Sequence, residues 1–358
     1  MAVHFHTLKV KEVRKETPDS VSIAFSLPAD LKDIFAFTPG QNITIKKELS
    51  GEEVRRSYSI CTAPYEDELR IAVKKVEGGK FSSFANESLQ AGDALDVLPP
   101  TGKFHTPLHA DHQKQYLAFA AGSGITPVIS IIKSTLRDEP QSQFTLVFGN
   151  RGRNSIIFFE ELEGLKNSNI DRFSFINILS RERTEAPINS GRIDLQKLED
   201  LSRLIKYERM DELFLCGPGE MIFCVREFLL KRGTNSRKIH FELFTTPGQK
   251  QVVSHKPDLV SDAGPRSSIT VKLDGRSFDF KLGFHSDSIL DAALKQGADL
   301  PFACKGGVCC TCKARLVEGE VEMDVNWGLE QEEVEQGYIL ACQSHPITEK
   351  VVVDFDVK

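Results

Sequence analysis

The chain has 358 residues, of which 40% are hydrophobic and 27% charged, a balance typical of a globular protein with two or three domains. Its formal net charge is −6, with no basic stretch suited to nucleic acid. No window of about eighteen residues is continuously apolar, and no signal peptide pattern opens the chain, so we expect neither a membrane span nor export. The sequence predicts a cytoplasmic protein.

The first block, residues 1–106, is rich in short runs typical of β-strands, such as SVSIAFSLP, NITIKK and LRIAVKKV. Pro, Gly and Asp turns separate the runs. This pattern predicts an antiparallel β-barrel with one helix near residues 80–89.

The second block, residues 107–246, alternates apolar strands with amphipathic helices: YLAFAAG is followed by PVISIIKSTL, and FTLVFGN by FFEELEGLK. Continuously apolar strands that alternate with helices indicate an α/β domain whose parallel sheet is covered on both faces.

Residues 247–266 are polar and rich in proline, and we interpret them as a linker. In the last block, residues 267–358, SITVKLDGRSFDFKL predicts a hairpin that turns at Asp274-Gly275. SDSILDAALKQG predicts a short helix with Ser286 or Asp287 as its cap.

Four cysteines stand within nine residues in CKGGVCCTC. Cys304, Cys309 and Cys312 have the spacing Cx4Cx2C, and Cys342 follows in YILACQSHP, which is the plant-type arrangement for a [2Fe-2S] cluster. A four-thiolate zinc site is the alternative, but structural zinc more often pairs two CxxC knuckles. Cys310 does not fit the ligand spacing, and we expect it to be a bystander.

Two stretches of the first block fit a cofactor that carries a ring and phosphates. In RSYS, residues 56–59, the arginine fits a phosphate and the tyrosine a flat ring. In GGKFSSF, residues 78–84, small residues precede a helix whose first amides suit a pyrophosphate. An ordinary exposed strand would also explain RSYS taken alone.

Two further stretches lie at strand-to-helix junctions of the second block, where parallel sheets bind ligands. AAGSGITP, residues 120–127, offers glycines that let the backbone approach phosphates, with Thr126 as the expected helix cap and Pro127 at the first helical position. CGPGEM, residues 216–221, is the second junction. A tight turn without a ligand is the alternative for the glycines.

The stretch SRER, residues 180–183, follows the predicted strand FSFINIL. Two arginines and a serine at the carboxyl end of a strand suit the 2′-phosphate that distinguishes NADPH from NADH. A solvated charged loop is the alternative.

The order of RSYS, GGKFSS, GSGITP, SRER, CGPGEM and Cx4Cx2C resembles the ferredoxin–NADP reductase family fused to a C-terminal plant-type ferredoxin, over essentially the whole chain. The resemblance implies an FAD-binding barrel, a nucleotide domain and an α+β ferredoxin domain of the β-grasp type. CKGGVCCTC and GYILACQSHP look most like the reductase components of bacterial phenylacetyl-CoA oxygenases (epoxidases).

The resemblance also implies roles for individual residues. FAD would be bound by Arg56, Ser57, Tyr58, Ser59, Gly79, Lys80, Ser82 and Ser83. NADPH would be bound by Gly122, Gly124, Thr126, Ser180, Arg181, Arg183, Cys216 and Gly217. Ser59 near the flavin N5, Cys216 facing the nicotinamide and Glu242 near the flavin would be the catalytic residues, although relatives often end near this glutamate. Cys304, Cys309, Cys312 and Cys342 would be the iron ligands.

With these cofactors, NADPH would give a hydride to FAD, and electrons would pass singly to the cluster and on to an oxygenase. One alternative is a reductase of the same build that serves a ring-hydroxylating, alkane or cytochrome-type monooxygenase. A second is a flavohaemoglobin-like protein, for which no globin segment is present. A third is a non-enzymatic electron carrier.

The docking site for the oxygenase is expected on the acidic stretch of residues 318–335. From residue 267 onward nine Lys and Arg stand against sixteen Asp and Glu, a net charge of −7 against about +1 for the rest. Alternation from Val317 to Val325 predicts that Glu318, Glu320, Glu322 and Asp324 share one exposed face. Solubility alone would also explain these charges.

Overall fold

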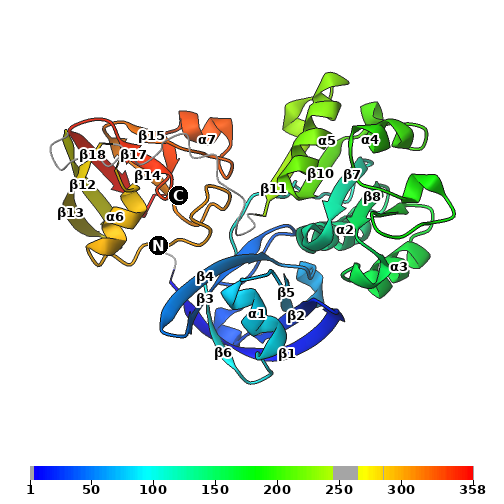
Figure 1. The fold of residues 1–358 in the computed structure, drawn as a ribbon, viewed down its shortest axis with the longest axis horizontal. Helices are drawn as coiled ribbons and strands as arrows, with labels where there is room; N and C mark the ends of the chain where they lie inside the picture. Colours follow the sequence, from blue (N-terminus) through cyan, green and yellow to red (C-terminus); the bar gives the residue numbers. More distant parts are fainter. Residues whose placement is uncertain (1–3, 245–264, 285, 358) are drawn as a thin grey trace. The chain divides into compact units, whose positions relative to one another are not determined.

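The computed structural model describes residues 4–244, 265–284 and 286–357 (Figure 1). It divides into two compact units, one formed by most of residues 7–244 and the other containing the chain from residue 265 on. The expected linker lies outside the described residues except for its last two positions. Within the described ranges, no helix is long and apolar enough to cross a membrane.

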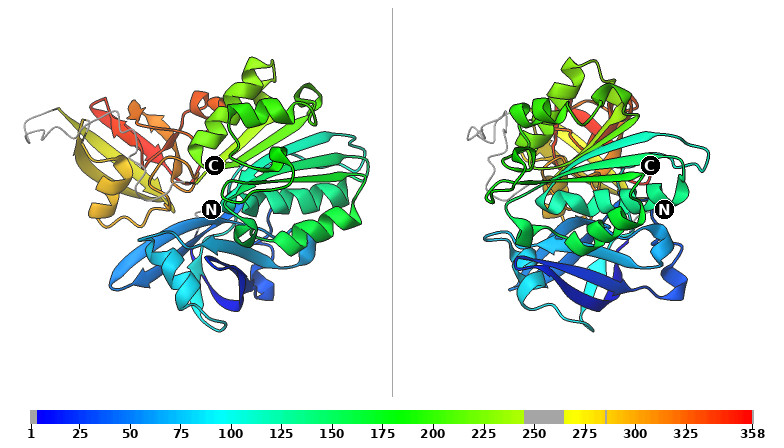
Figure 2. Two further views of the ribbon diagram at one scale, coloured as in Figure 1. Left: turned by 45° about the vertical axis from the view of Figure 1, so that its right-hand side comes forward. Right: turned by 90° about the vertical axis from the view of Figure 1, so that its right-hand side faces the viewer.

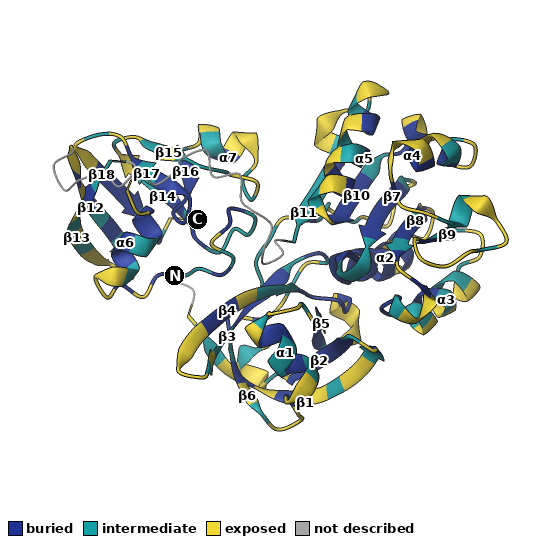
Figure 3. Cartoon of the chain, viewed as in Figure 1, coloured by how far each residue is buried: buried dark blue, intermediate teal, exposed yellow. Residues whose placement is uncertain are grey.

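The first part of the larger unit is a six-stranded sheet in the order β4-β3-β6-β1-β2-β5. Its elements are β1 (His6–Thr17), β2 (Ser20–Ser26), β3 (Asn42–Leu49), β4 (Glu52–Ser59), β5 (Leu69–Lys74), α1 (Lys80–Glu87) and β6 (Ala94–Val97). The pairs β1–β2, β2–β5 and β3–β6 are antiparallel. Along β1, buried and exposed residues alternate at its start (Figure 3). Each strand thus gives one face to an apolar core, and the predicted barrel with one helix is confirmed.

The second part of the larger unit is a five-stranded parallel sheet in the order β11-β10-β7-β8-β9. Its strands are β7 (Gln115–Ala121), β8 (Gln143–Asn150), β9 (Phe173–Leu179), β10 (Glu212–Gly217) and β11 (Ile239–Leu243). Its helices are α2 (Ile125–Asp138), α3 (Phe159–Ser168), α4 (Leu195–Leu201) and α5 (Gly219–Lys231). Helices α2 and α3 cover one face, and α4 and α5 the other (Figure 2). The predicted parallel sheet with two covered faces is confirmed.

The chain order creates a switch point at the centre of this sheet. After β7 the chain moves outward through β8 and β9, and it then returns to the other side of β7 with β10 and β11. The loops after β7 and β10 therefore leave neighbouring strands in opposite directions. Open parallel sheets bind their ligands at such a point.

The barrel and the parallel sheet are joined by contacts that α2 makes. Lys133 on α2 is 4% exposed, and its Nζ lies 2.8 Å from carboxylate oxygens of both Glu66 and Glu161. The Ser130 hydroxyl donates to the Thr62 carbonyl over 2.6 Å. These bonds, made where water is largely excluded, fix the chain that follows β4 relative to α2.

The smaller unit has a five-stranded mixed sheet in the order β13-β12-β18-β14-β16, with a two-stranded sheet of β15 and β17. Its elements are β12 (Arg266–Leu273), β13 (Arg276–Gly283), α6 (Ile289–Lys295), β14 (Lys313–Glu318), β15 (Val321–Met323), α7 (Gln331–Glu335), β16 (Tyr338–Leu340), β17 (Ser344–Pro346) and β18 (Lys350–Asp354). The strands β12 and β18, which lie at opposite ends of this part of the chain, pair in parallel, as in a β-grasp domain. Positive φ angles at Asp274 and Gly275 make the predicted hairpin turn.

Two helix starts differ from the sequence-based predictions. Helix α2 begins at Ile125 after a 3-10 turn over Gly122–Gly124, and Thr126 Oγ1 donates to the Ser123 carbonyl instead of capping the helix. Helix α6 is capped by Ser288, whose hydroxyl accepts from the Asp291 amide, rather than by Ser286 or Asp287. In α2 the glycine turn tightens the chain directly into the first helical turn, so no side-chain cap is needed.

Candidate functional site

The four predicted cluster ligands come together in the smaller unit as two pairs of thiols. The Cys309 side chain lies within interaction range of Cys304, and the Cys312 side chain within interaction range of Cys342. Within the described ranges, no three Cys, His, Asp or Glu side chains gather closely enough to hold one metal ion. Four thiols in two pairs suit a [2Fe-2S] cluster, in which each iron takes two thiolates.

Backbone amides around these thiols favour negative charge. The Cys309 thiol and the amides of Gly306, Val308 and Cys309 bond to Cys304, and together they lower the pKa of that thiol to about 6. The bond from Cys312 lowers the pKa of Cys342, with help from the Gly307 amide. A loop that presents several amides to sulfur is suited to an anionic iron–sulfur cluster.

Lys305 and Gly307 give this loop its shape. Both have positive φ angles, of 51° and 69°. A Cβ on Gly307 would lie 2.7 Å from Val325, so only glycine fits there. Cys310, the expected bystander, points elsewhere, since its Sγ donates to the Gly328 carbonyl over 2.6 Å.

In the larger unit, the end of the RSYS strand at Tyr58 lies beside the start of α1. The ring of Tyr58 lies 5.5 Å from that of Phe81 on α1, centroid to centroid. Ser82, which is buried, braces the loop before the helix, because its hydroxyl donates to the Gly79 carbonyl and accepts from the Val76 amide. Arg56 is exposed, and Lys80 pairs with Glu52. Tyr58 and the helix start thus form one surface that suits a ring and a pyrophosphate.

Ser59, at the end of this strand, meets Glu242 on β11. The Ser59 hydroxyl donates to Glu242 Oε2 over 3.3 Å. Burial raises the pKa of the Glu242 carboxyl to about 7, although the bond from Ser59 opposes the rise. A carboxyl that titrates near neutral pH next to a hydroxyl can hold or release a proton at this place.

The two glycine-containing junctions meet at the switch point between β7 and β10. A Cβ on Gly124 would lie 2.1 Å from the Cys216 carbonyl oxygen, so the loops touch through backbone. Cys216 is fully buried, and burial together with the charge of Glu242 raises the pKa of its thiol well above the ordinary range. The neutral thiol is therefore a packing surface and not a nucleophile.

The SRER loop is held against the loop that follows β8. The Arg181 amide donates to the Arg151 carbonyl, and the Arg153 amide donates to Glu182 Oε1 over 3.1 Å. Four exposed arginines thus follow two neighbouring strands: Arg151, Arg153, Arg181 and Arg183. The first two were not predicted from the sequence, although RGR directly after an apolar strand is a signal of the same kind as SRER.

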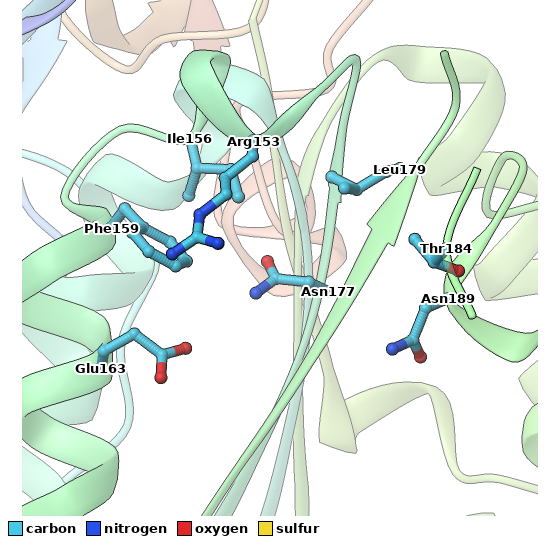
Figure 4. Close-up of a pocket in the computed structure, with 8 residues that line it drawn as sticks. All are labelled: Arg153, Ile156, Phe159, Glu163, Asn177, Leu179, Thr184 and Asn189. Carbon is cyan, nitrogen blue, oxygen red and sulfur yellow. The ribbon is translucent and has the colours of Figure 1, made fainter. Parts of the chain in front are cut away.

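Beside these loops lies a pocket of about 330 Å³ along the edge strand β9 (Figure 4). The Arg153 guanidinium lies 4.8 Å from the centre of the Phe159 ring, and Asn177 lines the pocket from the strand. The Asn177 side-chain oxygen is buried without a hydrogen-bond partner among the described residues. An aromatic face, a guanidinium and an amide acceptor together suit a flat heterocycle that carries donors.

The acidic stretch differs from the single exposed face predicted for it. Asp324 turns inward, and its Oδ2 lies 3.1 Å from His345 Nε2, with both side chains less than 15% exposed. A bulge in β14 between Leu316 and Glu318 turns Val317 outward, where it is 54% exposed. Of the four predicted acids, Glu318, Glu320 and Glu322 are exposed as predicted, whereas Asp324, which follows the end of β15 at Met323, is held inward by His345.

Three family models match the chain in succession. They are an oxidoreductase FAD-binding domain over residues 7–106, an oxidoreductase NAD-binding domain over 119–227 and a 2Fe-2S iron-sulfur cluster binding domain over 271–346. Each model covers the part of the chain in which the corresponding surface was found.

Curated relatives match over almost the full length. One of them, a component of the 1,2-phenylacetyl-CoA epoxidase of Escherichia coli, is 45% identical over 99% of this chain and 98% of its own. The chain belongs to the family of flavin and iron–sulfur reductases that serve oxygenases. The ferredoxin reductase component of the Rhodococcus rhodochrous 3-ketosteroid-9-alpha-monooxygenase is 34% identical to this reductase over 97% of the chain and 96% of its own. The reductase component of the Pseudomonas aeruginosa glycine betaine monooxygenase is 33% identical over 98% and 95%.

Solved structures share the fold of the reductase. Phthalate dioxygenase reductase matches 98% of both chains with a TM-score of 0.57 at 23% identity. An intact type IV self-sufficient cytochrome P450 monooxygenase matches 98% of the reductase and 41% of its own chain, with a TM-score of 0.70 at 19% identity. The reductase is therefore an oxidoreductase that uses FAD, a nicotinamide nucleotide and a [2Fe-2S] cluster.

Proposed function

We propose that the reductase passes electrons from NADPH to a phenylacetyl-CoA oxygenase that forms an epoxide. The observation that carries this proposal is the 45% identity, over almost the whole of both chains, to a component of a phenylacetyl-CoA epoxidase. We assign FAD binding to residues 1–106, nucleotide binding to 107–246 and the cluster to 267–358, joined by a linker at 247–266. The bound cofactors supply the redox chemistry, which consists of hydride transfer to the flavin and single-electron transfer to the cluster.

The protein's own residues bind and orient these cofactors. In the proposal, Tyr58 packs against the flavin ring, Arg56 and the start of α1 bind its phosphates, and Ser59 orients the ring edge. The Ser59 hydroxyl bonds to Glu242, whose carboxyl has a pKa of about 7, so the pair can supply or store a proton at the hydroxyl oxygen. Gly124 and Gly217 let the nicotinamide nucleotide approach the backbone at the switch point.

We further propose that the reductase prefers NADPH to NADH. An acidic residue after β9, the strand that precedes SRER, would favour NADH by accepting a hydrogen bond from the ribose 2′-hydroxyl. Here one oxygen of Glu182 already accepts from the Arg153 amide. Arg181, Arg183, Arg151 and Arg153 are all exposed around the same loops, and their guanidinium groups suit a phosphate dianion.

The nucleotide preference is tested by Arg181→Ala. We expect the KM for NADPH to rise roughly tenfold, because a charge-assisted bond to phosphate is lost. The KM for NADH should stay unchanged, and ferricyanide reduction over a range of nucleotide concentrations measures both. Arg203→Ala, an exposed arginine after α4, is the matched control. An equal rise for both nucleotides would contradict the assignment of Arg181 to the 2′-phosphate.

The choice of oxygenase is tested by reconstitution. The reductase is mixed with purified phenylacetyl-CoA oxygenase, and CoA-thioester product is counted per NADPH consumed. We expect a ratio near one, since one oxygenase turnover uses two electrons and NADPH carries two. Parallel mixtures contain the oxygenase components that act on 3-ketosteroids and on glycine betaine. Product only in one of those would overturn the phenylacetyl-CoA assignment and leave the reductase assignment in place.

A further inference from the structure

A short segment of the smaller unit, residues 324–328, lies directly on the loop that carries the cluster ligands, and we call it the strap. The Asp324 amide donates to the Gln343 carbonyl over 2.9 Å, and the Gly328 amide donates to the Gly307 carbonyl over 2.8 Å. The Asp324 side chain is anchored by His345. Both ends of the strap are therefore fixed to segments that bear cluster cysteines.

The inner side of the strap is packed tightly against the ligand loop. A Cβ on Gly307 would lie 2.7 Å from Val325, and one on Gly328 would lie 3.1 Å from the Cys309 carbonyl oxygen. The thiol of Cys310 is bonded to the Gly328 carbonyl. The bystander cysteine thus has a role, which is to tie the ligand loop to the strap.

The outer side of the strap carries Trp327, the only tryptophan of the chain, with 48% of its surface exposed. Exposed acids follow it in Glu330, Glu332 and Glu335, the last two on α7. Tryptophan is enriched among the residues that dominate protein interfaces. Acidic residues at the rim of such a contact attract basic partners.

We propose that the outer side of the strap, with Trp327 at its centre and α7 at its rim, is the surface on which the electron-accepting protein docks. The partner has an apolar contact ringed by Lys and Arg near its own redox centre. The strap is suited to this contact because Gly328, the residue after Trp327, is hydrogen-bonded directly to the ligand loop at Gly307. The inference rests on the proposed transfer of electrons to a partner oxygenase and adds where that partner binds.

The test compares Trp327→Ala with the wild-type holoprotein, using NADPH and two acceptors. Cytochrome c, a basic haem protein, serves as the protein acceptor, and ferricyanide as the small one. We expect the KM for cytochrome c to rise roughly tenfold or more, as for a central interface tryptophan. Ferricyanide reduction and the visible absorbance of the cluster should stay unchanged. The matched control is Val317→Ala, which shortens another exposed apolar side chain of the same unit.

A second variant tests the rim. Glu330, Glu332 and Glu335 are changed together to Gln, which should raise the KM for cytochrome c at low salt and flatten its salt dependence. An unchanged KM in both variants would overturn the docking surface.

The same variants are then measured with phenylacetyl-CoA oxygenase in place of cytochrome c. If Trp327→Ala loses affinity for cytochrome c, and the wild-type reductase makes no CoA-thioester product with the oxygenase, the docking surface stands and the proposed oxygenase is refuted. If Trp327→Ala instead gives the wild-type product yield and an unchanged KM for the oxygenase, the proposed oxygenase stands and the docking surface is refuted.

Discussion

At the scale of single residues, the contact between Ser59 and Glu242 is the feature that local sequence patterns could not predict. The two residues are 183 positions apart, and no periodicity connects them. Family resemblance suggested both, whereas the raised pKa of the carboxyl follows only from its burial in the folded chain. The cluster cysteines, in contrast, could be predicted from the sequence. Three of the four ligands lie within nine residues, at a spacing typical of a [2Fe-2S] cluster.

The carboxyl of Glu242 makes a prediction about pH. Its pKa is about 7 in the folded protein against an ordinary value of 4.5, so the folded state holds a proton that the unfolded state has lost between these values. Stability from this proton is fully present below about pH 4.5 and is lost as the pH rises through about 7. In Glu242→Gln the side chain stays neutral at every pH. The variant's melting temperature relative to wild type should therefore rise by a few degrees between pH 5 and 8.

Release of flavin fluorescence on heating measures this transition in the unit that contains Glu242. A matched control is Glu185→Gln, which neutralises an exposed loop carboxylate. If the difference in melting temperature between Glu242→Gln and wild type does not change with pH, the Glu242 carboxylate is not destabilised by burial.

The ligand assignment predicts different outcomes for neighbouring cysteines. Cys309→Ser removes one thiolate of a pair and should abolish the visible absorbance of the cluster while flavin content is retained. Cys310→Ser keeps all four ligands and a donor to the Gly328 carbonyl, so the cluster absorbance should persist. Iron and flavin counts on the purified variants test both expectations, and equal iron loss in the two variants would contradict the assignment.

At the scale of elements, strands and helices were predictable where a buried face imposed its period. The strands β7, β8 and β9 were predicted as YLAFAAG, FTLVFGN and FSFINIL to within about two residues, because each is a mostly apolar run. The differences lie where backbone geometry overrides side-chain pattern. Gly122–Gly124 forms a turn that starts α2 without a cap, and the bulge at Val317 ends the alternation in β14.

The junction of β7 and β10 makes a prediction for Gly124. In Gly124→Ala the new methyl group would meet the Cys216 carbonyl at 2.1 Å, so one of the two loops must move. Because we propose that the nucleotide binds where these loops meet, we expect kcat/KM for NADPH to fall on the order of 100-fold. Flavin content should be unchanged. Gly164→Ala on α3, where the added atom meets open space, should leave the rate as in wild type.

At the scale of the whole molecule, the chain combines three modules whose motifs are each local, which is why their order was readable from the sequence. The loop after β8, the strap and the inward turn of Asp324 were not, since each depends on segments that meet only in the folded units. Together the modules imply one route, in which electrons enter at the parallel sheet and leave from the cluster unit.

The most direct test of this route is electron paramagnetic resonance of the anaerobic holoprotein with NADPH and an NADPH-regenerating system. We predict the signal of a reduced [2Fe-2S] cluster in wild type. Cys309→Ser should show no such signal although its flavin bleaches at the same rate. Dithionite serves as the control that the wild-type cluster can be reduced. A wild-type flavin that bleaches with NADPH while the cluster signal appears only with dithionite would contradict the account.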